Sequence, residues 1–536
     1  MKSYAPLFVL SLIAAACSSS DDSGPSSQPP PDNKPTEREV AILAPLSAPV
    51  TLTDAQTIVP THAVAASFTQ PSAIDPEVLK QQLADGFGAF TTGPGEAQQV
   101  ETPDGAAVPP PRGNARKLTR FAHLADFQLA DDESPTRVAA VDGPPPLEAA
   151  WRPQEGHECR VVNAVVRTVN RIHKDAPFDF VLLGGDNADS AQQNELDWVL
   201  ALLGGADKLA CDSADANDPV AGSNNDGKDP FAPEGLDVPW YWVTGNHDVL
   251  IQGNFVVNAT SIAQSKGSKI PAGLGGTRDY RLPGSPIASD GEVPADAKRA
   301  AMPRNEMIER VLGHKGKAGP QAHGLGEYAK TTKKAYYEQD LGQSGIRLIV
   351  LDTAAESGGS EGLLRQSDID NFVKPALDRA KNDKKWVLFA SHHAAENIGD
   401  GGGIGGQQQP DAFSKEKWEA LLTANPHVIG HIAGHSHIHK VRHVAAPAPA
   451  TNGYWEVRTS AIADYPHQFR TIEVWDEDNG YLSIRSVAVN YATENDPVAE
   501  MGRTLGILDY TGHGVGAGQG EPKDRNVILW IKKPTF

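Results

Sequence analysis

Residues 181–189 read Val181-Leu-Leu-Gly-Gly-Asp186-Asn-Ala-Asp189, a short apolar run that ends in Gly-Asp. The apolar part is too short for a helix and is typical of a buried β-strand. In α/β sheets, the carboxyl ends of parallel strands form the edge at which ligands collect. The stretch therefore predicts an α/β fold in which a buried strand places Asp186 at such an edge.

Four other fragments have the same form, an apolar run closed by residue types that bind metals. They are Phe121-Ala-His-Leu-Ala-Asp126-Phe-Gln128, Trp240-Tyr-Trp-Val-Thr-Gly-Asn246-His247-Asp248, Trp386-Val-Leu-Phe-Ala-Ser-His392-His393 and His427-Val-Ile-Gly-His-Ile-Ala-Gly-His435-Ser-His437. The last two histidines are spaced i, i+2 at a strand end, so their imidazoles point the same way. Strand ends that all carry Asp, Asn or His indicate a metal centre.

In their order and wording, the five fragments resemble the motifs DxH, GDxxD, GNH(D/E), H and GHxH of the calcineurin-like metallophosphoesterases. The resemblance covers roughly residues 118–490. It implies a four-layer α-β-β-α sandwich, with two mixed β-sheets packed face to face and helices outside. It also implies a hydrolase that acts on phosphoric ester bonds. One position departs from the pattern, because Gln128 stands where the family usually has histidine.

The resemblance further implies two divalent metal ions, with Mn, Fe or Zn as candidates, and a small phosphorylated substrate. By motif position, Asp186 would bridge the two ions. A water held between such ions is acidic enough to act as a nucleophile at neutral pH. The remaining ligands would divide into Asp126, Gln128 and His437 on one ion, and Asn246, His392 and His435 on the other.

Catalytic roles fall on His247 and Asp248. In the family, this histidine stabilises the transferring phosphoryl group or protonates the leaving oxygen, which is general-acid catalysis, and we expect Asp248 to orient it. Asp189 could hold an imidazole in the same way, or it could be the N-cap of a helix at residues 192–203.

Gln128 has two interpretations. If its neutral amide oxygen ligates, the first site should bind more weakly and prefer Mn or Fe. Alternatively, His123 replaces the missing imidazole. The pleat of a strand argues against His123, because positions three apart face opposite sides of the sheet.

Composition narrows the possible partners. The chain has 536 residues and a formal net charge of −20, which argues against wrapping by nucleic acid because phosphates would be repelled. Three cysteines are too few for a disulfide scaffold. Cys159 and Cys211 could pair in an oxidising compartment or remain free thiols, and the sequence leaves both open. It also leaves the oligomeric state open.

The N-terminus predicts export. An apolar stretch at residues 7–13 is followed by Ala14-Ala-Ala-Cys17, which resembles a bacterial lipoprotein signal peptide at residues 1–17 with Cys17 as the lipidated residue. An ordinary secretory signal is the alternative. A Ser- and Pro-rich tether at 18–35 follows. We therefore expect a lipid anchor to the membrane in the bacterial cell envelope, periplasmic or at the cell surface.

The rest of the chain divides into three parts. We expect an irregular N-terminal arm at 36–117, a catalytic domain at 118–490 with an insertion at about 250–345, and an extension at 491–536 packed on that domain. A different class of function, a non-catalytic metal-binding surface lipoprotein, would use the same fold. The retained ligand set argues against it, since a decayed site should have lost several of these residues.

Overall fold

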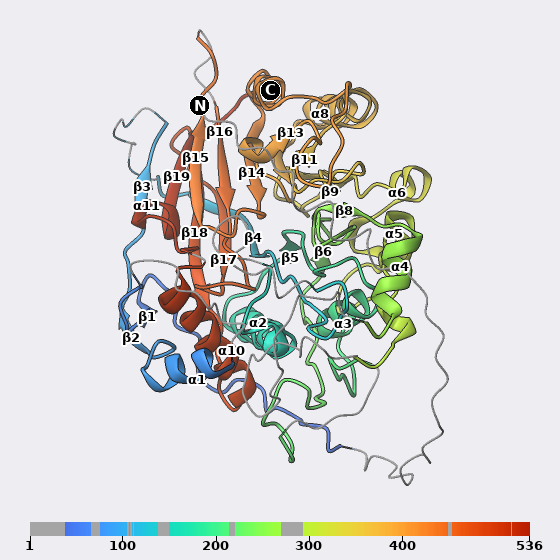
Figure 1. Ribbon diagram of the computed structural model, residues 1–536. Coiled ribbons are helices and arrows are strands. Elements are labelled where there is room, and N and C mark those ends of the chain that lie inside the picture. The colour runs from blue at the N-terminus through green and yellow to red at the C-terminus, as the bar shows by residue number, and fades with distance from the viewer. Residues whose placement is uncertain are drawn as a thin grey trace, which may run out of the picture.

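The computed structural model (Figure 1) describes residues 38–65, 76–103, 105, 107, 110, 112–137, 150–213, 220–269, 293–448, 453–515 and 517–536. The predicted signal peptide, Cys17 and the tether lie outside these residues. Within them, none of the helices is both long and apolar enough to span a bilayer.

The first sheet has seven strands in the order β3-β19-β18-β17-β4-β5-β6. Strands β4, β5 and β6 are parallel, whereas β17 and β18 are antiparallel to their neighbours, so the sheet is mixed. The strands are β3 (Gln99–Glu101), β4 (Arg116–Leu124), β5 (Phe180–Leu183), β6 (Trp240–Tyr241), β17 (Gln468–Asp476), β18 (Tyr481–Asn490) and β19 (Val527–Lys532).

The second sheet has six strands in the order β15-β16-β14-β12-β10-β9. Its four central strands are parallel, and an antiparallel strand closes each edge. The strands are β9 (Tyr337–Asp340), β10 (Ile346–Val350), β12 (Trp386–Ala390), β14 (Val428–Ala433), β15 (Lys440–Val444) and β16 (Tyr454–Arg458).

The side chains of the second sheet alternate between two apolar cores. Leu348 and Leu388 belong to the large core shared with the first sheet, whereas their neighbours Ile349 and Phe389 face the helices outside. This period of two is what a strand buried on both faces requires. The two sheets also meet directly, because Trp455 of β16 donates its indole N–H to the Trp530 carbonyl of β19 (2.8 Å).

Helices cover the outer faces, which completes the predicted four-layer sandwich and confirms the fold class (Figure 1). Apolar residues of α2 and α3 join the large core, and those of α8 and α9 join the core on the outer face of the second sheet. The bounds are α2 (Glu158–Asp175), α3 (Gln193–Gly204), α8 (Lys374–Asn382), α9 (Lys415–Thr423) and α10 (Pro497–Leu508), and α10 packs on α2.

The expected insertion contains short elements in its described parts. These are β7 (Leu250–Ile251), β8 (Phe255–Val256), α4 (Ala259–Lys266), α5 (Arg304–Gly313) and α6 (Glu327–Thr332). Two further short strands, β11 (Gly362–Leu363) and β13 (Ile398–Gly399), lie in the connections that follow β10 and β12, and they pair with each other as a separate small sheet. All of them lie in the connections that follow β6, β10 and β12.

Both ends of the described chain contribute to the sandwich. In the segment expected to be an irregular arm, β1 (Gln56–Pro60) pairs with β2 (Phe90–Pro94), and α1 (Pro76–Ala84) packs Leu79 against Leu505 and Leu508 of α10. Strand β3 from the arm pairs with β19 from the C-terminal stretch, and β19 in turn pairs with β18. The stretch at 491–536 therefore supplies a strand of the first sheet.

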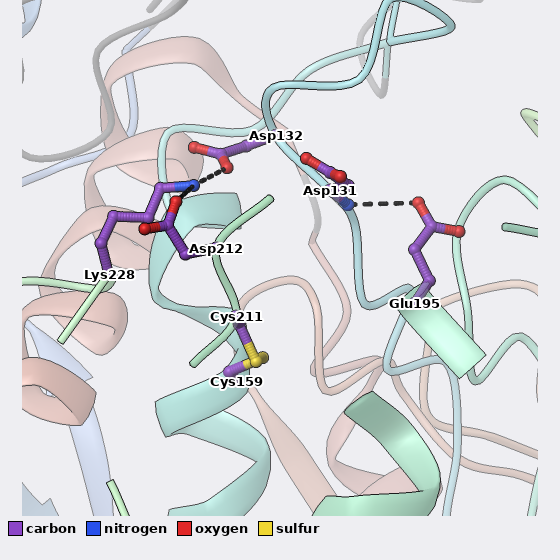
Figure 2. Close-up of a disulfide and its surroundings, with 7 residues drawn as sticks. All are labelled: Asp131, Asp132, Cys159, Glu195, Cys211, Asp212 and Lys228. Atoms are coloured by element: carbon purple, nitrogen blue, oxygen red, sulfur yellow. Dashed lines mark hydrogen bonds and ion pairs between the residues drawn. A yellow bond between two sulfur atoms is a disulfide. The ribbon is translucent and has the colours of Figure 1, made fainter. Parts of the chain in front are cut away.

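Cys159 and Cys211 form a disulfide, which resolves the alternative that the sequence left open (Figure 2). It joins the first turn of α2 to the loop that follows α3. Beside it, Lys228 of the same loop makes an ion pair with Asp132 (2.7 Å). The disulfide therefore fixes the loop after α3 to α2, and the ion pair fixes it to the segment that follows β4.

Candidate metal centre

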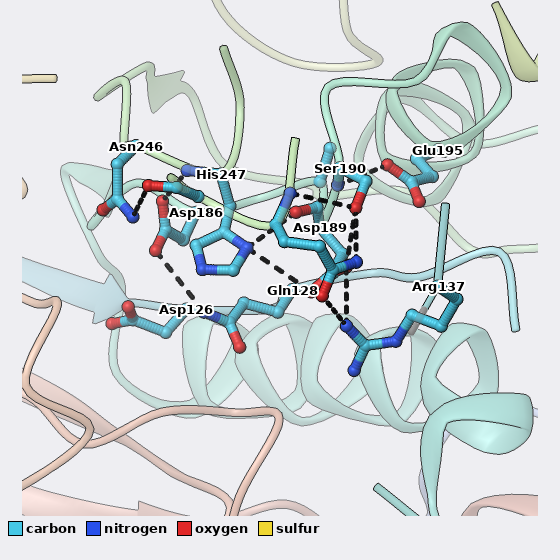
Figure 3. Close-up of polar contacts among 12 residues, drawn as sticks. Asp126, Gln128, Arg137, Asp186, Asp189, Ser190, Glu195, Asn246 and His247 are labelled. Carbon is cyan, nitrogen blue, oxygen red and sulfur yellow. Dashed lines mark hydrogen bonds and ion pairs between the residues drawn. The ribbon is translucent and has the colours of Figure 1, made fainter. Parts of the chain in front are cut away.

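The polar residues that follow β4, β5, β6, β12 and β14 come together at the carboxyl ends of these strands. Figure 3 shows Asp126, Asp186 and Asn246 gathered near the ring of His247. In the described part of the chain, two sets of ligand-type atoms lie within 4.8 Å of one another: Asp126, Asp186 and His392, and His392, His393 and His435. Since His392 belongs to both sets, the sets are contiguous.

The backbone turns sharply at most of these positions. Five of the seven predicted ligands have positive φ angles: Asp126 (54°), Gln128 (40°), Asp186 (52°), His435 (68°) and His437 (53°). Non-glycine residues rarely adopt this left-handed conformation, and such strain concentrates at functional sites. Backbone hydrogen bonds from Asp126 to Gly185 (3.0 Å) and from Gln128 to Asp186 (2.8 Å) hold two of the turns together.

Gly245 allows the strand ends to approach this closely. A Cβ atom at this position would lie 2.0 Å from Oδ1 of Asp186. The same Oδ1 accepts a hydrogen bond from the backbone N–H of His247 (2.8 Å). The glycine of the Gly-Asn-His motif is therefore required by the position of the Asp186 carboxylate.

His392 is oriented by the backbone. Its Nδ1 donates to the carbonyl of Gly184 (2.7 Å), which leaves Nε2 directed at the carboxylates. Nε2 lies 3.0 Å from Asp186 and 3.9 Å from Asp126. This is the arrangement of a metal-binding imidazole, whose other nitrogen is held by a second partner.

The adjacent His393 is a member of the second cluster but is committed to other contacts. Its Nε2 lies 3.0 Å from the carbonyl of Ser360, and its Nδ1 lies 2.9 Å from the hydroxyl of Thr353. Both ring nitrogens are therefore occupied within the protein, which leaves His392 and His435 as the histidines of this cluster that could hold a cation.

His437 is held by a residue that the sequence did not single out. Its Nδ1 pairs with Oδ2 of Asp464, while its Nε2 lies 3.4 Å from Asp126. Asp464 is buried and accepts a second hydrogen bond from Nε of Arg152 (2.5 Å). Asp464 follows strand β16, so the same pattern of a carboxylate after a strand could have identified it.

The residues present fit metal ions. Within the described residues, Oε1 of Gln128 and Oδ1 of Asn246 are buried without a hydrogen-bond partner. The amide nitrogen of Asn246 donates to the Gly253 carbonyl (3.0 Å), and that of Gln128 lies 3.5 Å from Asp186. A buried oxygen without a partner is costly. Coordination to a cation would satisfy these oxygens.

His123, the alternative ligand, is held by a hydroxyl group. Its Nδ1 pairs with the hydroxyl of Thr459 (2.6 Å). Burial, reinforced by Arg470, lowers the pKa of His123 to about 3, so the ring is neutral. The contact with Thr459 favours the glutamine assignment that the pleat suggested.

His247 is oriented by Asp189, and the expectation that Asp248 does so is wrong. Nδ1 of His247 donates to the Asp189 carbonyl (2.6 Å) and lies 3.4 Å from its carboxylate (Figure 3). The Asp248 carboxylate instead accepts the backbone N–H groups of Gly245 (2.8 Å) and Asn187 (2.9 Å). It therefore ties together the loops after β5 and β6.

The alternative role of Asp189, as a helix N-cap, also fails. The N-cap of α3 is Gln192, which forms a capping box with Glu195. Asp189 lies three residues earlier and is fully buried. Its carboxylate is consequently available to His247.

The charged side chains of the site shift one another's pKa values. Burial would raise the pKa of Asp186, but the neighbouring His392 and His247 outweigh burial and hold this pKa well below its usual range. Burial would lower the pKa of His392, yet Asp186 and Asp126 raise it to about 9. A cation therefore has to displace a proton from His392, so metal binding should release protons and weaken as the pH falls.

Comparison with known proteins gives the class. The sequence profile described as calcineurin-like phosphoesterase matches residues 119–439, which is more than half of the chain. The chain therefore belongs to the calcineurin-like phosphoesterase family, and its fold is consistent with that family.

Among solved structures that are similar, one is purple acid phosphatase PPD1, isolated from seeds of yellow lupin (Lupinus luteus). The match has 12% sequence identity and a TM-score of 0.28, and it covers 74% of this chain and 55% of that one. This chain thus spans about half the length of that phosphatase. No curated protein matches the chain.

Proposed function

We propose that the protein hydrolyses phosphate esters, monoester or diester, at a centre of two divalent cations bridged by Asp186. The observation that supports this most directly is the cluster of Asp126, Asp186 and His392, whose ligand atoms lie within 4.8 Å of one another. Gln128 and Asn246 follow the ends of β4 and β6, and each has a buried side-chain oxygen without a hydrogen-bond partner among the described residues. Two bound cations would supply a nucleophile at neutral pH and neutralise a phosphoryl group. Asp126, Gln128 and His437 would hold one ion, and Asn246, His392 and His435 the other.

The protein's own part in the reaction centres on His247. Burial would lower its pKa, but Asp186 and Asp189 overcome burial and raise it, which favours the protonated ring. With Nδ1 tied to Asp189, Nε2 is the nitrogen that can give a proton to a leaving oxygen. The alternative of a non-catalytic metal-binding lipoprotein gains no support from an acid held in this way.

The test is the hydrolysis of p-nitrophenyl phosphate by purified protein, together with measurement of bound metal. We expect two metal ions per chain, loss of activity on chelation and recovery with Mn²⁺. Metal without any activity on a panel of monoesters and diesters would favour the binding-protein alternative.

Replacing Gln128 by histidine should strengthen the first metal site. Imidazole is a softer and stronger donor than an amide oxygen, so Gln128→His should tighten binding there roughly tenfold and shift preference toward zinc. Isothermal titration with Mn²⁺ and Zn²⁺ measures both effects. His123→Ala is the control and should leave metal affinity unchanged; loss of metal only in that variant would overturn the glutamine assignment.

For location, we propose the bacterial cell envelope, with an acyl anchor on Cys17. The sequence features at residues 1–17 are typical of a lipoprotein signal. The disulfide between Cys159 and Cys211 supports an oxidising compartment, where such bonds persist. The anchor would place the site near the membrane.

Cys17→Ser tests the anchor. Because acylation requires the thiol, the variant should leave the membrane fraction or remain uncleaved, whereas wild type should partition with the membrane and start at a modified Cys17. Fractionation and intact-mass analysis of the mature N-terminus measure this. Unmodified wild-type protein in the soluble periplasm would contradict lipidation.

A further inference from the structure

The aspartate behind His247 is itself held by a buried arginine. Nη1 of Arg137 lies 3.1 Å from Oδ2 of Asp189 and 2.6 Å from the side-chain oxygen of Gln252. The amide nitrogen of Gln252 donates a hydrogen bond to the same Asp189 carboxylate (3.2 Å). Figure 3 shows Arg137 on the far side of Asp189 from the His247 ring. The position of the acid thus depends on Arg137.

A second arginine has the same relation to the metal ligand His437. Nε of Arg152 donates to Oδ1 of Asp464, and the other oxygen of that carboxylate holds Nδ1 of His437. Gln154 fixes the same loop, because its amide nitrogen donates to the carbonyl of Ala463 (2.8 Å). The position of this ligand thus depends on Arg152.

One carboxylate joins the two arginines. Glu155 accepts hydrogen bonds from Nε (2.8 Å) and Nη2 of Arg137. Its Oε1 also accepts the backbone N–H of Arg152 (2.9 Å) and lies 4.0 Å from Nη1 of that residue. His247 and His437, which follow different sheets, are therefore linked through a single chain of contacts centred on Glu155.

The chain of contacts is shielded from water. Arg137 and Glu155 are each 5% exposed, and Arg152 is 3% exposed. Two guanidinium groups this close repel each other, and at low dielectric the negative charge between them is what holds them together. A buried ion network of this kind is costly to form and loses its geometry when its central charge is removed.

We propose that Glu155 is a positioning residue that couples the acid His247 to the metal ligand His437 through Arg137 and Arg152. Neutralising Glu155 releases both arginines, so Asp189 and Asp464 lose their fixed orientation together. The inference rests on the proposed function for one of its readouts, the leaving-group dependence. The other readout, metal affinity, requires no turnover.

The test uses three variants of the full-length protein. Asp464→Asn should weaken Mn²⁺ binding roughly tenfold, as loss of a partner behind a ligand does, with little change in leaving-group dependence at saturating metal. Asp189→Asn should leave Mn²⁺ affinity nearly unchanged but alter the leaving-group dependence, with a larger loss of rate on phenyl phosphate than on p-nitrophenyl phosphate. Glu155→Gln should show both effects, which a purely structural residue would not.

The matched control is Glu477→Gln. Glu477 is also a fully buried glutamate paired with an arginine, Arg485 (2.8 Å), but it lies after β17, next to the start of β4 and away from the site. This variant should change stability alone. Glu155→Asp keeps the charge but shortens the side chain, so it should show both losses in a weaker form. This variant provides the test if Glu155→Gln does not fold.

The outcomes are distinguishable. Wild-type metal affinity and leaving-group dependence in Glu155→Gln, or a change in only one of them, would overturn the coupling. If the wild-type protein binds two metals but hydrolyses no ester, the proposed function fails, while the metal affinities of Asp464→Asn and Glu155→Gln still test the branch to His437.

Discussion

Asp186→Ala should lose both metal ions and nearly all turnover. The Asp186 carboxylate lies 3.0 Å from His392, the residue that the two ligand sets share, and accepts a hydrogen bond from the backbone N–H of His247. Because both ions would share this bridging ligand, each ion would lose a ligand at once. Metal analysis after dialysis and the rate on p-nitrophenyl phosphate measure the loss.

A surface aspartate is the control for Asp186→Ala. Asp237 is paired with Lys317 (2.5 Å), and both side chains are about half exposed, so Asp237→Ala should keep two metals and full activity. Circular dichroism and melting in the presence of a chelator establish that Asp186→Ala is folded. Retention of two tightly bound ions by the folded variant would show that Asp186 is not the bridge.

His247→Asn should keep both metals and lose rate by about 10²–10⁴-fold, the usual contribution of a positioned general acid. The loss should be largest for esters with poor leaving groups, since these need a proton most. The ratio of rates on phenyl phosphate and p-nitrophenyl phosphate, measured with metal content confirmed, gives the effect.

An equal loss on both substrates would instead assign His247 to holding the phosphoryl group. Loss of metal in His247→Asn would contradict both roles. Asparagine is chosen because it can keep a hydrogen bond to the Asp189 carbonyl, which accepts from Nδ1 in the wild type. The variant therefore changes proton donation more than local packing.

The sequence alone determined the sandwich and the main composition of the site. Apolar runs of four to six residues can only be buried as strands when helices alternate with them, and their last residues then share one edge. For this reason Asp126, Asp186, Asn246 and His392 could be predicted to lie at one edge before any geometry was known, and the family resemblance supplied their predicted roles. The i, i+2 spacing did the same for His435 and His437.

Only the tertiary structure decided which residues hydrogen-bond to these side chains and orient them. Asp248 follows His247 directly in the sequence, yet its carboxylate turns to the loop backbone, and Asp189 from another strand end holds the imidazole. Sequence neighbours at a sharp turn point in different directions, so adjacency does not predict contact.

The same reason explains why Arg137, Glu155, Arg152 and Asp464 gave no early signal as a group. Arg152 and Asp464 are separated by 312 positions and meet only because the segment before α2 packs against the loop after β16. Local sequence patterns identify residues that follow a strand and therefore lie at the edge of a sheet. Contacts between loops depend instead on how the two sheets and their connections pack, and this packing is decided by the fold as a whole.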